Sequence, residues 1–154
     1  MNPVIEKRVA TFIARYSPSI AAQVREARAR LRTQFPRGYE LVFDNALVLG
    51  ISPTEKTRDA FISIAAYPRW VTLFFLRGVD LPDPGKLLAG SGKQVRGIRL
   101  QDAQQIDTPG VRALIEHASA ALRPQLSAAP ALTTVVKTEV AKQRARRPPA
   151  TVRS

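Results

Sequence analysis

The residue types best suited to ligand binding gather in residues 77–96, a segment that combines glycines, two aspartates and several cations. Glycines allow backbone N–H groups to approach an anion closely, and the side chains of Lys93 and Arg96 add positive charge nearby. The segment therefore predicts a site for a small anionic ligand or an acidic protein surface. Its candidate residues are Arg77, Asp80, Asp83, Gly90, Gly92, Lys93 and Arg96.

The familiar phosphate-binding motifs do not fit this segment. A Walker loop ending at Gly92-Lys93 requires an earlier glycine and a following serine or threonine, where the chain has Leu87 and Gln94. A dinucleotide fingerprint beginning at Gly90 requires glycine where the chain has valine, and it precedes a helix rather than a strand. The alternative interpretation is a structured turn with surface cations, in which the two aspartates cap local amides.

Residues for other chemistry are scarce. Cysteine is absent and His117 is the single histidine, which excludes disulfides, thiolate catalysis and multi-histidine metal sites. Acid–base catalysis needs paired groups in perturbed environments, whereas His117 falls on the rim of its predicted helix with no partner marked by the sequence. We therefore predict no catalytic residue, no metal site and no cofactor, and we favour a binding protein over an enzyme.

The charge balance suggests an alternative function. The 154 residues include 24 basic and 12 acidic side chains, a formal net charge of +12, which indicates an anionic partner. One flank of a predicted helix and the C-terminal segment are both rich in arginine, as expected of weak, sequence-non-specific binding to nucleic acid. The candidate residues for this function are Arg25, Arg28, Arg32, Arg144, Arg146 and Arg147. A solvated helix face and a solubilising tail remain open as interpretations of the same residues.

Hydrophobic periodicity predicts the elements that position these residues. Helical spacing predicts helices over 3–15, 18–35 and 108–123. Ser17 followed by Pro18 is typical of a helix start. Runs of β-branched and aromatic residues predict strands over 39–49, 60–66, 70–76 and 95–100. This order predicts an α+β domain in which an antiparallel sheet of four to five strands packs with two N-terminal helices and one C-terminal helix.

The composition changes after about residue 126. Residues 1–126 carry the apolar periodicity of one folded domain. Residues 127–154 lack aromatic side chains and predict a basic tail that is largely disordered or forms a short helix through Leu132, Val136 and Val140. The longest apolar run is far shorter than the ~20 residues of a membrane span, so we expect a cytoplasmic protein with no membrane partner.

A longer pattern runs through the same region: Leu73-Phe74-Phe75, Gly78, Leu81, Asp83-Pro84, Leu87-Leu88, Gly90, Gly92-Lys93 and Arg96. Over about residues 5–122 the chain resembles the YdhG-like family, a domain family of unknown function. The resemblance implies an α+β domain with an antiparallel sheet. Some members resemble frataxin-type iron chaperones, which implies iron binding as a third candidate function.

Two departures from that family count against iron binding. Gly97 stands where many members have histidine. The first two predicted helices offer only Glu6 and Glu26 among seven basic residues, whereas hard cations need several oxygen ligands. We therefore place the iron chaperone below the two anion-binding functions.

Overall fold

The N-terminal helices begin where the sequence supplies caps. The computed structural model describes residues 2–142 and 144–148. Helix α1 (Pro3–Ala14) starts after Asn2, whose side chain accepts hydrogen bonds from two backbone N–H groups of the first turn. Helix α2 (Pro18–Gln34) starts after Ser17, whose hydroxyl accepts from the N–H of Ile20. Proline occupies the first position of both helices, where no N–H is needed. The two predicted N-terminal helices are confirmed to within one residue.

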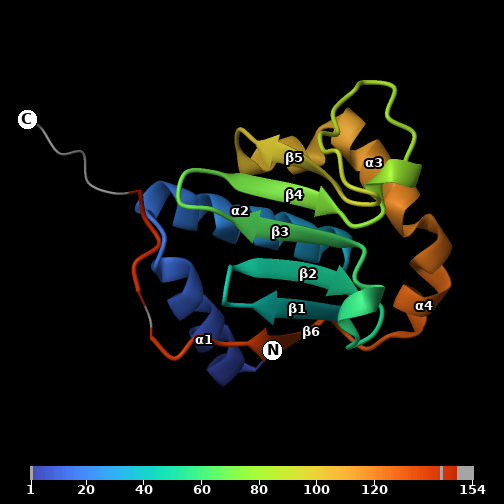
Figure 1. Ribbon diagram of the computed structural model, residues 1–154. Helices are drawn as coiled ribbons and strands as arrows, with labels where there is room; N and C mark the ends of the chain where they lie inside the picture. The colour runs from blue at the N-terminus through green and yellow to red at the C-terminus, as the bar shows by residue number, and fades with distance from the viewer. Residues whose placement is uncertain (1, 143, 149–154) are drawn as a thin grey trace, which may run out of the picture.

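Six strands form one sheet in the order β5-β4-β3-β2-β1-β6 (Figure 1). They are β1 (Tyr39–Phe43), β2 (Val48–Ser52), β3 (Ile62–Ala66), β4 (Val71–Phe75), β5 (Arg96–Leu100) and β6 (Thr133–Thr138). Strands β1 to β5 pair antiparallel, whereas β6 pairs with β1 in parallel. The predicted α+β class is therefore confirmed. The purely antiparallel sheet of four to five strands is wrong, because the chain returns to add a sixth, parallel strand at the β1 edge.

One predicted strand is in fact a hairpin. Residues 39–49 were expected to be continuous, but the chain turns at residues 44–47 and Phe43 pairs with Val48 across the hairpin. Asp44 and Asn45 explain the turn, since both residue types favour turn conformations. The segment after Ser52 connects β2 to β3 and leads into the short 3-10 helix η1 (Thr57–Asp59).

The helix expected through Leu132, Val136 and Val140 is also wrong. Strand β6 occupies this segment, and five of its six residues are Thr or Val, which favour strands. Leu132 and Val136 pack against the core, so this part of the predicted tail belongs to the folded domain. Residues 144–148 are described, while residues 143 and 149–154 of the predicted disordered end lie outside the described residues.

The C-terminal helix is divided into shorter pieces. After β5, the 3-10 helix η3 (Ala103–Asp107) leads into α3 (Pro109–Ser119), and η4 (Ala120–Leu122) then connects to α4 (Arg123–Ala128). Pro124 has no N–H to donate to the turn before it, so a regular α-helix cannot run from α3 into α4. The predicted single helix over 108–123 is therefore interrupted near its C-terminal end.

The helices cover one face of the sheet. In Figure 1, α1 and α2 lie behind the strands, and the side facing the viewer carries no α-helix of the described chain. Val9, Phe12 and Val24 of the helices join one buried core with Val42 and Leu73 of the strands. Strand alternation places a second set of side chains on the opposite face, which carries no α-helix of the described chain and which we call the open face. Several of these side chains, among them Leu41, Ser63 and Thr72, are nevertheless buried by their neighbours. Two rows of paired residues cross the open face: Leu41, Gly50, Ser63, Phe74, Gly97, and Phe43, Val48, Ala65, Thr72, Arg99.

Candidate functional site

Two of the candidate residues in the 77–96 segment form hydrogen bonds to the backbone of the same segment. The Asp83 carboxylate accepts hydrogen bonds of 2.9 Å from the backbone N–H groups of both Leu87 and Leu88. The Arg96 guanidinium donates to the backbone carbonyls of Gly92 and Val95 at 2.6 and 2.8 Å. Asp83 and Arg96 therefore have structural partners within the loop.

The glycines of this segment differ in what they do. Gly90 has a φ of +137°, a conformation that side chains rarely adopt, and a Cβ there would lie 3.2 Å from the Val95 carbonyl oxygen. A Cβ on Gly78 would lie only 2.5 Å from the Cβ of Arg96. The backbone at residue 78 can therefore pass this close to Arg96 only because glycine has no side chain. Gly92 has open space around it. Gly90 and Gly78 thus shape the loop, whereas Gly92 and the neighbouring Lys93 are exposed.

Two of the predicted ligand-binding residues line a cleft at one end of the sheet. Arg77 follows β4, and Asp80 ends the 3-10 helix η2 (Gly78–Asp80). Both border a cavity of about 390 Å³ between η1, η2 and the α3–α4 segment. The other five candidates, Asp83, Gly90, Gly92, Lys93 and Arg96, are not among the residues that line it. The structure therefore separates the predicted set into a cleft pair and a loop group.

The cleft combines an aromatic floor with a polar rim. The rings of Phe61 and Phe75 are 7% and 0% exposed and lie at its base. Phe61 is held from below by an edge contact with Phe35, at 5.2 Å between ring centroids. The α3–α4 wall contributes His117 and Gln125, along with Leu122 and small alanines. Such a surface suits a ligand that has an apolar body and a polar end.

Two arginines carry positive charge on the rim. Arg58 and Arg77 both line the cleft and are exposed, and neither forms an ion pair within residues 2–142 and 144–148. Asp59 accepts a 2.7 Å hydrogen bond from the Thr54 hydroxyl, and Asp80 adds a second carboxylate. A guanidinium presents a planar fork of donors that matches a carboxylate. The rim can therefore bind a carboxylate without first breaking an internal ion pair.

The residues that sequence reasoning missed come from distant segments. Arg58 lies in a short 3-10 helix with no motif around it, and His117 was expected only at the rim of its helix. Gln125 lies in α4, which was not predicted as a separate helix. The cleft exists because these three segments meet where β3 begins and β4 ends. No local sequence pattern indicates that they do so.

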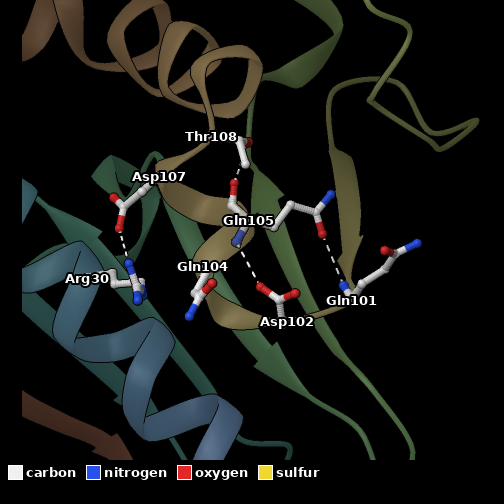
Figure 2. A pocket seen from close by; sticks show the side chains of 7 residues that line it. All are labelled: Arg30, Gln101, Asp102, Gln104, Gln105, Asp107 and Thr108. Carbon is white, nitrogen blue, oxygen red and sulfur yellow. Dashed lines mark hydrogen bonds and ion pairs between the residues drawn. The ribbon is translucent and has the colours of Figure 1, made fainter.

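A second hollow, shown in Figure 2, uses its polar groups internally. Asp107 pairs with Arg30 and also accepts a 3.2 Å hydrogen bond from Gln34. Asp102 accepts from the backbone N–H of Gln105, whose side chain in turn accepts from the N–H of residue 101. These contacts cap η3 and attach it to α2, so the hollow is a product of packing rather than a set of groups awaiting a ligand.

The predicted arginine row on α2 takes part in a buried network. Arg28 donates two hydrogen bonds to Glu40 of β1 at 2.9 and 2.7 Å, and two to Glu6 of α1, both at 3.0 Å. Arg32 also pairs with Glu6 and donates to the Thr134 hydroxyl of β6 at 3.1 Å. Arg25 is exposed and outside this network. The structure thus directs two of the three arginines inward.

The network shifts the pKa values of Glu6 and Arg28. Burial acts to raise the pKa of Glu6, but the hydrogen bonds and positive charges of Arg28 and Arg32 outweigh it and lower that pKa. Burial acts to lower the pKa of the Arg28 guanidinium, but Glu40 and then Glu6 outweigh burial and raise it. The partners of Glu6 and Arg28 therefore favour the charged form of each of these two side chains.

The tail arginines are divided in the same way. Arg146 donates to the backbone carbonyl of Asp44 and, at 3.2 Å, to the Tyr16 hydroxyl. The Asp44 side chain is fully buried and pairs with Arg15 at 2.5 Å. Burial, followed by the charge of Arg146, lowers the pKa of the Arg15 guanidinium. Arg144 and Arg147 are exposed. The described end of the chain is therefore docked through Arg146, on the side of the molecule where α1 ends (Figure 1).

Comparisons of this chain with family models, curated proteins and solved structures found no match. No helix in the described ranges is long and apolar enough to cross a membrane. Those same ranges hold no cluster of three or more His, Cys, Asp or Glu side chains that could bind a metal ion. The site is therefore interpreted from its own geometry.

Proposed function

We propose that this chain is a binding module for a small carboxylate ligand with an apolar body, which it holds in the cleft between η1, η2 and the α3–α4 segment. The observation that carries the proposal is the pair of guanidiniums, Arg58 and Arg77, on the rim of a cleft floored by Phe61 and Phe75. The cavity of about 390 Å³ suits a small molecule better than a protein surface.

The two ends of such a ligand would be recognised by different physical effects. Its apolar body would cover the apolar lining that is still accessible, mainly Leu81, Leu122 and the neighbouring alanines, because Phe75 is fully buried. It would gain about 25 cal/mol for each Å² removed from water. Its carboxylate would accept charge-assisted hydrogen bonds from the rim, each contributing about 1.5–3 kcal/mol. An uncharged ligand of the same shape would keep the first contribution and lose most of the second.

A titration with a matched pair of probes tests this proposal. The probes are 3-phenylpropionate and its uncharged counterpart 3-phenylpropanamide, followed by backbone amide shifts in ¹H–¹⁵N spectra. We expect shifts at Phe61, Arg77 and His117, with at least about tenfold tighter binding of the acid than of the amide.

Two variants and one control locate the binding groups. Arg77→Ala and Arg58→Ala should each weaken binding of the acid by about tenfold or more while leaving binding of the amide unchanged. Lys93→Ala removes a cation from the same 77–96 segment but outside the cleft, and it should have no effect. Equal binding of the two probes, or an effect of Lys93→Ala equal to that of Arg77→Ala, would contradict the proposal.

A further inference from the structure

The turn between β3 and β4 carries a stacked column of two aromatic rings and one guanidinium. The rings of Tyr67 and Trp70 stack with centroids 5.0 Å apart and planes inclined by 24°. The guanidinium carbon of Arg99 lies 3.8 Å from the centroid of the Trp70 ring. A guanidinium this close covers one face of the indole, so Tyr67 must occupy the other face. We call these three residues the column.

The backbone holds the column in place at the edge of the open face. The N–H of Tyr67 donates to the carbonyl of Trp70 at 2.9 Å, which closes the turn. Arg99 lies opposite Thr72 in the β4–β5 pairing, on the same face of the sheet as Trp70. Tyr67 and Trp70 are half-buried and Arg99 is exposed. The two ends of the column, one aromatic and one cationic, are therefore presented to solvent.

The surroundings of the column are positively charged. Arg69 lies exposed in the same turn. On the other side of Tyr67 is a hollow of about 380 Å³ bordered by Arg146 and Arg147 of the docked C-terminal segment. None of the described residues that line this hollow is an aspartate or glutamate. Arg146 pairs with the buried Asp44, whereas Arg69, Arg99 and Arg147 form no ion pair within residues 2–142 and 144–148. These three exposed arginines therefore leave this end of the sheet positively charged.

We propose that this end of the sheet binds single-stranded nucleic acid. A base would stack on either end of the column, the Tyr67 ring or the Arg99 guanidinium, because base–aromatic and base–guanidinium stacking tolerates any base. The phosphates on either side of that base would then lie near Arg69 and Arg147. A duplex fits poorly, since its bases are already stacked on one another and do not present their faces to a protein.

The binding assay uses labelled 15-nucleotide single strands, one of deoxythymidine and one of uridine, with fluorescence anisotropy at low and moderate salt. Both strands test the same stacking chemistry and differ only in the sugar. We expect binding that weakens as salt rises, and weaker binding of a 15-base-pair duplex. Trp70 is the single tryptophan of the chain, so its emission should change when the single strand binds.

Matched variants separate stacking from general charge. Tyr67→Ala should weaken binding at least about fivefold, whereas Tyr67→Phe keeps the ring and should bind like the unaltered protein. Arg99→Gln and Lys93→Gln each remove one positive charge. Lys93, however, precedes β5, whose first residue pairs with Phe75 at the end of β4 that is opposite to Trp70. Arg99→Gln should therefore weaken binding at least about fivefold more than Lys93→Gln.

Three results would overturn the proposal. Equal losses for Arg99→Gln and Lys93→Gln, or duplex binding as tight as single-strand binding, would show non-specific attraction to the whole basic surface. A Trp70 emission that changes with protein concentration, together with self-association in sedimentation, would show that a second copy of the chain covers the column. If Tyr67→Ala fails to fold, the comparisons of Tyr67→Phe and of the two glutamine variants still decide the question.

Discussion

Replacing Arg28 with methionine should remove a large part of the free energy of unfolding. The Arg28 side chain is 11% exposed and forms two hydrogen bonds each with Glu40 and Glu6. Methionine keeps most of the apolar stem of arginine but supplies no donor. The Glu40 carboxylate, 2% exposed, would then keep the Thr134 hydroxyl at 2.7 Å and Arg32 at 3.7 Å as its remaining described partners.

The expected loss of unfolding free energy follows from the carboxylate that Arg28→Met leaves without its main partner. Removing one partner of a buried ion pair costs about 3–5 kcal/mol, because the other charge stays buried without compensation. A domain of this size has an unfolding free energy of about 5–15 kcal/mol, so a loss of about 3–5 kcal/mol would be at least about a fifth of the total.

Urea unfolding followed by far-ultraviolet circular dichroism measures this effect. Arg28→Met should lower the midpoint with little change in the slope, because the surface exposed on unfolding stays the same. Arg25→Met, three residues earlier on the exposed side of the same helix, should change stability by no more than about 0.5 kcal/mol. Adding Glu40→Gln to Arg28→Met should recover part of the loss. A loss below about 1 kcal/mol, or no recovery with Glu40→Gln, would refute the reasoning.

Three further predictions concern the strand, the acid response and the loop. A chain that stops after Ala131 lacks β6, so it should unfold at a lower temperature and self-associate in sedimentation, because the β1 edge is then unpaired. Stability should fall as the pH drops below 4.5, the ordinary pKa of Glu6. The folded pKa is lower, so the unfolded chain binds more protons in this window, and Glu6→Gln should flatten that part of a urea-unfolding pH profile. Asp83→Ala removes the acceptor for the N–H groups of Leu87 and Leu88, so hydrogen exchange of those two amides should speed up while 3-phenylpropionate binding is retained.

The fold could be predicted from the sequence where a local pattern had one meaning. Helical spacing located both N-terminal helices, with Ser17 and Pro18 marking the start of the second. Runs of β-branched and aromatic residues located the strands expected over 60–66, 70–76 and 95–100. The prediction failed where two patterns competed. Leu132, Val136 and Val140 have helical spacing, but the Thr and Val residues between them favour a strand, and pairing with β1 decided the outcome.

The candidate site could be predicted only in part, because charge partners come from distant segments. Arg77 and Asp80 were recognised as candidates, and they do line a cleft. The row of Arg25, Arg28 and Arg32 has the spacing of a phosphate-binding face. The sequence does not show that Glu6 and Glu40 lie opposite that row, and these two carboxylates decide where the arginines point.

The division of the arginines into those that pair with carboxylates and those that do not also determines which cations are available to a ligand. At least seven of the 12 acidic side chains form ion pairs with arginines, and three of them, Glu6, Glu40 and Asp44, do so in largely buried networks that join helices to strands. At two places, arginines outside these networks form no ion pair within residues 2–142 and 144–148. Arg58 and Arg77 lie where β3 begins and β4 ends. Arg69 lies in the turn at the other end of these two strands, and Arg99 of β5 lies beside that turn, against Trp70.

The separation of these two places makes the two proposed sites independent. Strands β3 and β4 are each five residues long, which puts about 17 Å between their ends, and substitutions that far apart usually have additive effects. Arg77→Ala should therefore weaken 3-phenylpropionate binding without changing single-strand binding, and Arg99→Gln should do the reverse. If each variant instead weakened both ligands equally, the common cause would be the net charge of +12, and neither site would be specific.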